Sequence, residues 1–219
     1  MTVREKFEND LKRVQGLMLD LCHMSIQALE KSVEALFDQD IDAALLLIDQ
    51  DRFINRLEEH LNDEVILLIA KQQPVATDLR RLIVMIKAAS DMERIGDYAV
   101  NIAKETIRLG ETKVVYPTEK IAQMRDQAIA MLKNMVQAFI EEDMNKAKEI
   151  ALLDDQIDTL YGEAIVEILN TPTENMKDIG QVAQLSFVCR YLERSADHAT
   201  NLAELLFYLV KGKHYELNQ

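Results

Sequence analysis

Turn-forming residues are scarce in this chain of 219 residues, which has six glycines, three prolines and no tryptophan. All-β sandwiches and dinucleotide-binding sheets use Gly and Pro at many turns, so the scarcity argues against both folds. Hydrophobic residues make up 48% of the chain, and this fraction excludes wholesale disorder. The composition therefore predicts an all-α protein built from few, long helices.

Positive charge is also in short supply, because 25 Lys and Arg face 38 Asp and Glu and give a formal net charge of −13. Phosphate backbones and anionic lipids repel such a chain, so we expect no nucleic-acid partner and no direct membrane insertion. A role in binding cations is compatible with this sign.

Cysteines and long apolar runs are few. Cys22 and Cys189 lie inside apolar helical stretches, which is typical of a reducing compartment and provides no disulfide framework. The N-terminus lacks the apolar stretch of a signal peptide, and no apolar run approaches the ~20 residues needed to span a membrane. We expect a cytoplasmic protein.

The few helix-breaking residues fall between segments with helical periodicity. Asp40 and Asp143 precede such segments as N-caps, and Pro74, Pro117 and Pro172 lie near helix starts. The predicted helices cover residues 3–38, 41–71, 76–109, 118–141, 144–169 and 174–211. Six long helices with short joints are typical of antiparallel bundles.

The second half of the sequence repeats the first. At an offset of 103 residues Asp40 matches Asp143 and Asp51 matches Asp154. At an offset of 100 residues the matching pairs are Glu93 and Glu193, Arg94 and Arg194, Asp97 and Asp197, Ala99 and Ala199, Asn101 and Asn201, and Ala103 and Ala203. This duplication predicts two tandem, pseudo-symmetric three-helix bundles, over residues 1–112 and 113–219.

The matches at the offset of 100 are concentrated in one block. Residues 93–103 agree with 193–203 at 6 of 11 positions, whereas residues 78–92 agree with 178–192 at only 1 of 15. Shared packing alone would preserve apolar positions along the whole helix, but most of the matched residues are polar. We interpret the block as a functional polar cluster present in both repeats.

Each copy of the block carries two acids four residues apart, Glu93 with Asp97 and Glu193 with Asp197, which places each pair on one helix face. Like charges at this spacing cost about 0.2–0.5 kcal/mol in a bare helix, so their presence in both copies indicates a compensating cation. Carboxylates combined with amide oxygens and water suit hard cations such as Mg²⁺, Ca²⁺, Mn²⁺ or ferric iron.

Two carboxylates cannot complete a shell of about six ligands, so neighbouring helices must contribute more. We expect Asp51 from the second helix, and Asp154 and Asp158 from the fifth, to complete the metal sites. Alternatively, Arg94 and Arg194 neutralise the acids at i,i+3, and the protein is a metal-free helical scaffold.

A metal-dependent hydrolase or phosphatase is a further alternative, in which clustered ions activate water. No His or Lys repeats beside the acids, since His198 corresponds to Tyr98. The sequence also has no P-loop, GxGxxG or GxSxG motif and no Glu-x-x-His di-iron signature. We therefore expect no enzyme activity.

The two blocks, Asp-Met-Glu93-Arg-Ile-Gly-Asp97-Tyr-Ala-Val-Asn101 and Tyr-Leu-Glu193-Arg-Ser-Ala-Asp197-His-Ala-Thr-Asn201, resemble those of the PhoU family. The Gln73-Pro74 joint, the following Asp78-Leu79-Arg80 and the total length are similar as well. The second block departs from the usual Glu-Arg-Ile-Gly-Asp at Ser195 and Ala196, although a small residue keeps the glycine position.

This resemblance implies a non-catalytic negative regulator of phosphate uptake and of the phosphate-starvation response, the Pho regulon. Its implied partners are the ATPase subunit of the phosphate ABC transporter and a sensor histidine kinase, and a homodimer is expected. It also implies multinuclear iron or zinc at Glu93, Asp97, Glu193 and Asp197. The chemistry of the ligands leaves magnesium and manganese open.

Overall fold

In the computed structural model, which describes residues 3–110, 114, 116–172 and 176–217, every regular element is an α-helix. The helices are α1 (Val3–Asp38), α2 (Ile41–Gln72), α3 (Ala76–Leu109), α4 (Glu119–Glu141), α5 (Met144–Ala151), α6 (Asp154–Asn170) and α7 (Met176–Lys211). The start expected at residue 174 and the expected boundary between residues 112 and 113 lie outside the described residues.

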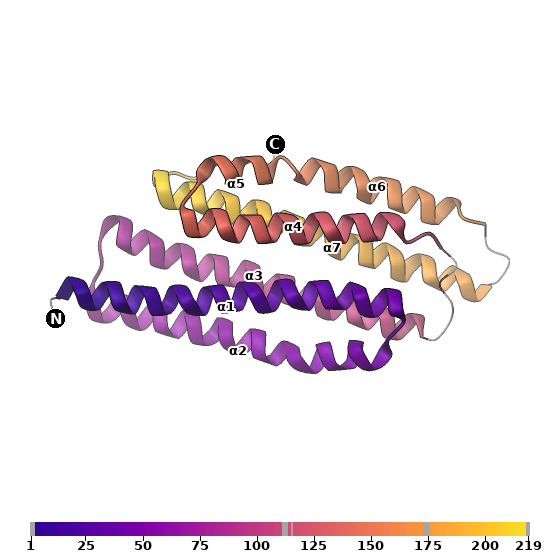
Figure 1. Ribbon diagram of the computed structural model, residues 1–219, viewed down its shortest axis with the longest axis horizontal. Coiled ribbons are helices and arrows are strands. Elements are labelled where there is room, and N and C mark those ends of the chain that lie inside the picture. The colour runs from indigo at the N-terminus through magenta and orange to yellow at the C-terminus, as the bar shows by residue number, and fades with distance from the viewer. Residues whose placement is uncertain (1–2, 111–113, 115, 173–175, 218–219) are drawn as a thin grey trace.

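The helices form two elongated bundles that lie side by side (Figure 1). Helices α1, α2 and α3 pack together as the first bundle, and α4 to α7 form the second. The bundles meet where α3 packs against α7 and α1 against α4. The predicted fold, all-α with two tandem three-helix bundles, is confirmed.

Aspartates begin the second helix of each bundle, as predicted. The Asp40 side chain accepts a hydrogen bond from the Ala43 N–H at 2.8 Å, and Asp143 accepts from Asn145 at 2.9 Å and Lys146 at 3.2 Å. Each cap follows a residue in the left-handed region, Gln39 or Glu142, with φ of 53° and 52°. The shared geometry shows that the offset of 103 residues also relates the ends of α1 and α4.

Replacing Asp143 by alanine is expected to lower the free energy of unfolding by about 1 kcal/mol, because the first backbone N–H groups of α5 lose their acceptor. Urea denaturation of the variant measures the loss. Asp143→Asn is the matched control and retains an acceptor, so an equal loss in both variants would contradict a capping role.

The predicted fifth helix, residues 144–169, is divided in two. Leu152 and Leu153 separate α5 from α6, and the Leu153 N–H donates to the Ile150 carbonyl at 3.0 Å in a tighter turn. Both leucines keep φ and ψ close to helical values, so the chain continues in nearly the same direction. Periodicity could not reveal this division because it barely changes which side chains face the core.

The contacts between α3 and α7 obey the internal symmetry. Tyr98 stacks on Tyr191 with ring centroids 6.0 Å apart, and His198 Nδ1 lies 2.8 Å from Asp91 Oδ1. These two contacts join equivalent positions, since residues 91 and 98 correspond to 191 and 198. Tyr98 Oη also lies 3.4 Å from His198 Nε2, so the pseudo-twofold axis passes between two equivalent residues.

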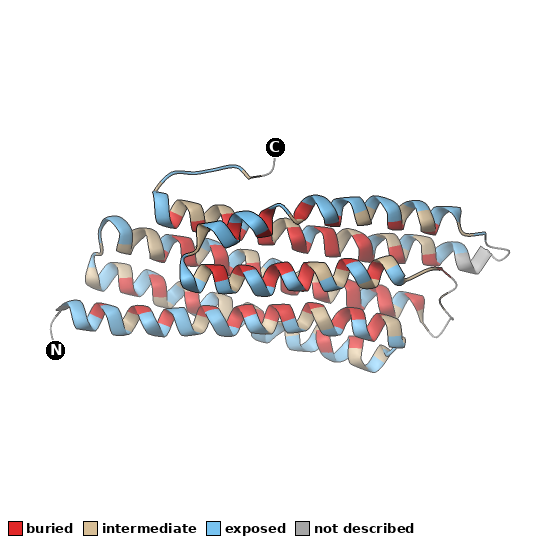
Figure 2. Ribbon diagram, turned by 45° about the horizontal axis from the view of Figure 1, so that its top comes forward, coloured by how far each residue is buried: buried red, intermediate tan, exposed pale blue. Residues whose placement is uncertain are grey.

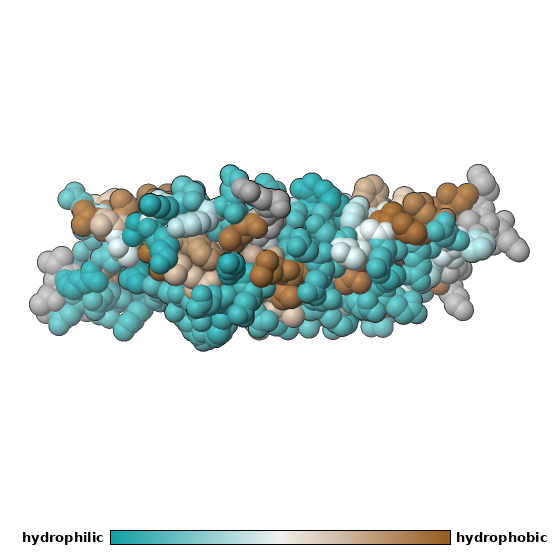
Figure 3. Space-filling model, turned by 90° about the horizontal axis from the view of Figure 1, so that it is seen from above, coloured by the Kyte–Doolittle hydropathy of each residue, from teal (hydrophilic) through white to brown (hydrophobic). Residues whose placement is uncertain are grey.

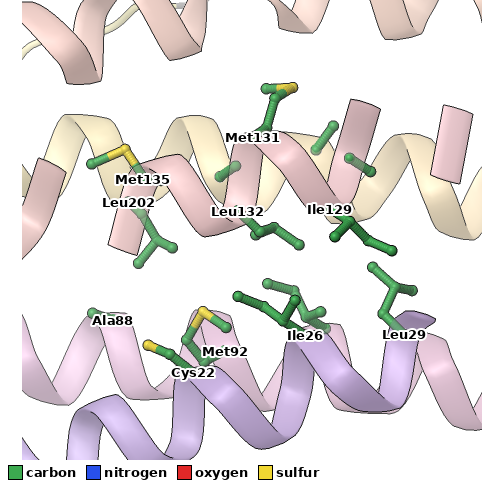
Figure 4. Packing of buried hydrophobic residues seen from close by; sticks show 14 of the residues in the cluster. Cys22, Ile26, Leu29, Ala88, Met92, Ile129, Met131, Leu132, Met135 and Leu202 are labelled. Atoms are coloured by element: carbon green, nitrogen blue, oxygen red, sulfur yellow. The ribbon is translucent and has the colours of Figure 1, made fainter. Parts of the chain in front are cut away.

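One large hydrophobic cluster runs through both bundles, and a small separate cluster of Ala44, Leu47 and Ala103 lies between α2 and α3. Buried positions recur along the helices on the sides that face their neighbours (Figure 2). Figure 4 shows the contact zone between the bundles, where the facing residues are Cys22, Ile26, Leu29, Ala88, Met92, Ile129, Leu132, Met135 and Leu202. Both cysteines are buried and free, as the composition predicted.

Candidate functional site

The first acidic cluster consists of Asp51 and Asn55 on α2 and Glu93 and Asp97 on α3. The Asn55 amide donates to Asp51 Oδ2 at 3.2 Å. The other side-chain oxygens of both residues, Asp51 Oδ1 and Asn55 Oδ1, are buried and have no hydrogen-bond partner in the part of the chain that the structure describes. Two unsatisfied acceptors next to two further carboxylates provide an oxygen-rich site for a cation.

Gly96 allows α2 to approach the acids of α3. A Cβ atom at this position would lie 3.2 Å from two carbons of Ile54 and 3.5 Å from Asp51 Oδ1. Gly96, which lies between Glu93 and Asp97 in the sequence, therefore lets the Asp51 carboxylate lie directly against α3.

Charge repulsion within the first cluster is visible in its acid–base properties. Burial, reinforced by the nearby Asp97 charge, raises the pKa of Asp51. The same two causes raise the pKa of Glu93, although Arg94 partly offsets them. Each carboxylate is thus less stable in its charged form than in water, and a bound cation would reverse this penalty.

Arg94 partly provides the internal neutralisation that the sequence offered as an alternative. Its Nη1 lies 2.9 Å from Asp97 Oδ2, and its Nε lies 4.0 Å from Glu93 Oε2. The Arg94 side chain is 59% exposed, so this pair is weak and easily exchanged. Asp51 and Asn55 receive no hydrogen bond from Arg94, and their orphan oxygens remain.

The second acidic cluster consists of Asp158 on α6 and Glu193 and Asp197 on α7. Glu193 is only 8% exposed, and its Oε2 has no hydrogen-bond partner. Burial and then the Asp197 charge raise the pKa of Glu193, while burial and then Asp158 raise the pKa of Asp197. The structure therefore brings Asp158 of α6 close to Glu193 and Asp197 of α7.

Arg190, which sequence reasoning missed, pairs with the second cluster. Its Nη1 lies 2.5 Å from Glu193 Oε1, and its guanidinium lies over the Tyr161 ring at 5.9 Å. Among the described residues, Arg194 makes no ion pair with this cluster, contrary to the pairing proposed for it. The first repeat has Ser90 at the equivalent position, so comparing the repeats could not identify Arg190.

Replacing Arg190 by methionine is expected to lower the free energy of unfolding by about 1 kcal/mol, because buried Glu193 loses its cationic donor. Methionine keeps the apolar contact with the Tyr161 ring. Adding Glu193→Gln should restore most of the lost stability in urea denaturation, and an unchanged loss would show that the pair contributes nothing.

Asp154 and His198 lie near the second cluster in the sequence, and the structure gives each a separate environment. Asp154 is buried as the first residue of α6. His198, although next to Asp197, is bonded to Asp91 at the pseudo-twofold axis, so its ring is engaged there.

The oxygen donors fit a hard cation in type, since the first cluster has buried, unsatisfied oxygens at Asp51 Oδ1 and Asn55 Oδ1 and the second has one at Glu193 Oε2 among the described residues. Within the described residues, no three His, Cys, Asp or Glu side chains converge closely enough to hold one metal ion in their present conformations. Binding would therefore require carboxylates to turn from their arginines.

The fold and the clusters define a class of proteins with duplicated three-helix bundles. Each repeat carries a carboxylate cluster, between α2 and α3 in the first and between α6 and α7 in the second. The family model described as PhoU domain matches residues 18–106 and 121–206, one match in each repeat. The chain belongs to the PhoU family.

Curated relatives and solved structures agree with this assignment. The chain is 37% identical over 216 residues to a phosphate-specific transport system accessory protein PhoU homolog of Clostridium acetobutylicum, covering 98% of this chain and 99% of that protein. The homolog of Streptococcus pneumoniae is 32% identical, with 99% and 100% covered. Crystal structures of PhoU from S. pneumoniae and Pseudomonas aeruginosa match with TM-scores of 0.88 and 0.89, at 30% and 31% identity. They cover 96% and 94% of this chain and 99% and 100% of theirs.

Proposed function

We propose that this chain is a negative regulator of phosphate uptake and of the phosphate-starvation response, and that it acts as a non-catalytic adaptor. Its membership of the PhoU family makes it an accessory protein of phosphate transport. The observation that carries the finer proposal is the duplicated pair of acidic clusters on long helices, without a repeated acid–base or nucleophilic side chain beside them.

The proposed partners are the ATPase subunit of the phosphate ABC transporter and a sensor histidine kinase, with the protein acting in the cytoplasm as a homodimer. The long helices offer extended faces to such partners. Figure 3 shows a mainly hydrophilic face interrupted by separate apolar patches. Exposed apolar residues of the second bundle include Leu152, Val166 and Leu169, which are 61%, 57% and 65% exposed. No helix of the described part of the chain is long and apolar enough to cross a membrane.

The acidic clusters are proposed to hold metal, with Asp51, Glu93 and Asp97 in one repeat and Asp158, Glu193 and Asp197 in the other. Asp154 is proposed as a further ligand of the second repeat. Multinuclear iron or zinc, or magnesium or manganese, suits these oxygen donors. A bound ion would neutralise repelling carboxylates and so fix the relative positions of neighbouring helices.

A metal-free scaffold is the second candidate, and a specific observation favours it. Arg94 and Arg190 already pair with one carboxylate in each cluster. In that case the acidic faces would present charge to partners directly.

Deleting the gene is expected to raise expression of phosphate-regulated genes during phosphate-rich growth, because the negative regulator is lost. A reporter assay measures the effect, and the wild-type gene supplied in trans should restore low expression. A pull-down from phosphate-replete cells should recover the transporter ATPase and the sensor kinase. Unchanged reporter output would contradict the proposed role.

A further inference from the structure

A cavity of about 260 Å³ lies between the two bundles, away from both acidic clusters. Helices α1, α3, α4 and α7 all contribute to its walls. Its apolar lining includes Met18, Cys22, Met85, Ala88, Met135 and Leu202. In Figure 4, Cys22 and Ala88 face Met135 and Leu202 across the gap between the bundles.

The cavity is partly open to solvent, and its volume is larger than that of an enclosed apolar cavity that binds a small hydrocarbon. A dry cavity of about 150 Å³ lined by apolar side chains already binds benzene. Three methionines in the wall provide flexible, polarizable surface that adapts to a ligand. Leu19 and Ile140, which are 41% and 55% exposed, also line the cavity and provide apolar surface towards solvent.

The fold itself does not require this cavity, as its symmetry-related position shows. Cys22 corresponds to Arg125, whose guanidinium lies over the Phe37 ring at 5.7 Å, and Ala88 corresponds to the fully buried Val188. Phe37 is in turn the equivalent of Ile140. In the second repeat, the larger side chains of Arg125 and Val188 therefore occupy the positions that correspond to Cys22 and Ala88 of the cavity.

The charged groups of the cavity form an ion pair that joins the two bundles, and Gln15 lines the cavity as well. Arg81 Nε and Nη2 both donate to Glu142 Oε1, at 3.1 and 2.8 Å, while Arg81 Nη1 lies 3.9 Å from Asp78 Oδ1 on its own helix. The two side chains are 30% and 40% exposed, and Glu142 is the C-cap of α4. A second carboxylate could take the place of Glu142 on Arg81, and Glu142 would then return to water at little cost.

We propose that this cavity binds a free monocarboxylate with an unbranched hydrocarbon chain, a medium-chain fatty acid. The chain fills the apolar space between the bundles, and its carboxylate binds Arg81 in place of Glu142. The ligand thereby replaces the ion pair between Arg81 of α3 and Glu142 at the end of α4, so its binding removes one contact between the two bundles. This site is independent of the acidic clusters and of the function proposed above.

Isothermal titration of the full-length protein with hexanoate, octanoate and decanoate tests the proposal, using monomeric ligand below its micelle concentration. Affinity should increase with chain length, by up to about fourfold for each additional buried methylene. Decanol is the uncharged control and should bind more weakly than decanoate. Absence of decanoate binding, or equal binding of decanol, would overturn the proposal.

Four variants locate the site. Arg81→Gln should weaken decanoate binding by about tenfold without affecting decanol, since a charge-assisted hydrogen bond is lost. Glu142→Gln should strengthen decanoate binding several-fold because it removes the competing carboxylate. Ala88→Val, which introduces the residue of the second repeat, should weaken both ligands by filling the cavity, and Cys22→Leu fills the same space if Ala88→Val fails to fold.

Arg52→Gln is the matched control for Arg81→Gln. Arg52 is exposed on α2, pairs with Asp49 and does not line the cavity. The substitution removes the same charge and should leave decanoate binding unchanged. If Arg52→Gln weakens binding as much as Arg81→Gln, or if neither Ala88→Val nor Cys22→Leu affects it, the carboxylate does not bind where we propose.

Discussion

Replacing Glu105 by leucine is expected to stabilise the protein by about 2 kcal/mol at neutral pH, because a buried ion pair is often less favourable than an apolar contact. The Glu105 side chain is only 2% exposed, and its Oε2 has no hydrogen-bond partner among the described residues. Within the same part of the chain its ion-pair partner is Arg108, which is 58% exposed. The second repeat has Leu205 at the equivalent position, so the fold accommodates leucine there.

The gain should depend on pH in a defined direction. Burial raises the pKa of Glu105 above its ordinary value, although Arg108 partly offsets this rise. The charged carboxylate therefore costs stability at neutral pH, and this cost disappears as the pH falls through the folded-state pKa towards about pH 4. The difference in unfolding free energy between Glu105→Leu and the wild type should shrink over the same range.

Urea denaturation at neutral and acid pH measures this difference. Glu59→Leu, at an exposed position on α2, is the matched control and should change stability little. Arg108→Ala should act in the opposite direction and lose about 2 kcal/mol, because the buried charge of Glu105 is left unpaired. A Glu105→Leu variant that is destabilised at both pH values would contradict this account.

The second large effect concerns the acidic clusters. The double variant Asp97→Asn with Asp197→Asn is expected to reduce bound iron, zinc, magnesium or manganese to background while the helical fold stays intact. Each substitution removes a carboxylate that repels its neighbours, so the metal-free variant should fold at least as well as the wild type. Elemental analysis of protein never exposed to a metal-affinity column measures the metal, and circular dichroism checks the fold.

A matched control removes the same two charges elsewhere. Asp49 and Asp155 are exposed on α2 and α6, so Asp49→Asn with Asp155→Asn should leave metal uptake unchanged. If the wild type takes up no metal even after incubation with each ion, the scaffold in which Arg94 and Arg190 neutralise the acids is the better description.

The sequence predicted the fold well because helix boundaries here have local causes. Asp40 and Asp143 cap helices through their own side chains, and Gly110 ends α3 with a positive φ that glycine adopts without strain. The division at Leu152 escaped prediction because leucine is not a helix breaker and both Leu152 and Leu153 keep nearly helical backbone angles. Local signals mark where a helix starts and stops, whereas a short change of pitch inside an amphipathic segment leaves no such signal.

The site was predictable to the extent that the two repeats agree. Comparison of the repeats identified Glu93, Asp97 and their equivalents, and the spacing on the neighbouring helix identified Asp51 and Asp158. It could not identify Arg190, because that arginine and the ring of Tyr161 beneath it occur in only one repeat. The duplication therefore reveals shared chemistry and conceals what distinguishes the two clusters.

Joining both bundles in one polypeptide has a consequence at the axis between Tyr98 and His198. Two identical subunits meeting there would have to present the same side chain twice, tyrosine against tyrosine or histidine against histidine. A covalently linked pair escapes that constraint, so an imidazole can face a phenol while Asp91 and Tyr191 diverge to match their unlike neighbours. The contact between the two bundles is thus asymmetric, with different side chains at equivalent positions, which a homodimer of either half could not have.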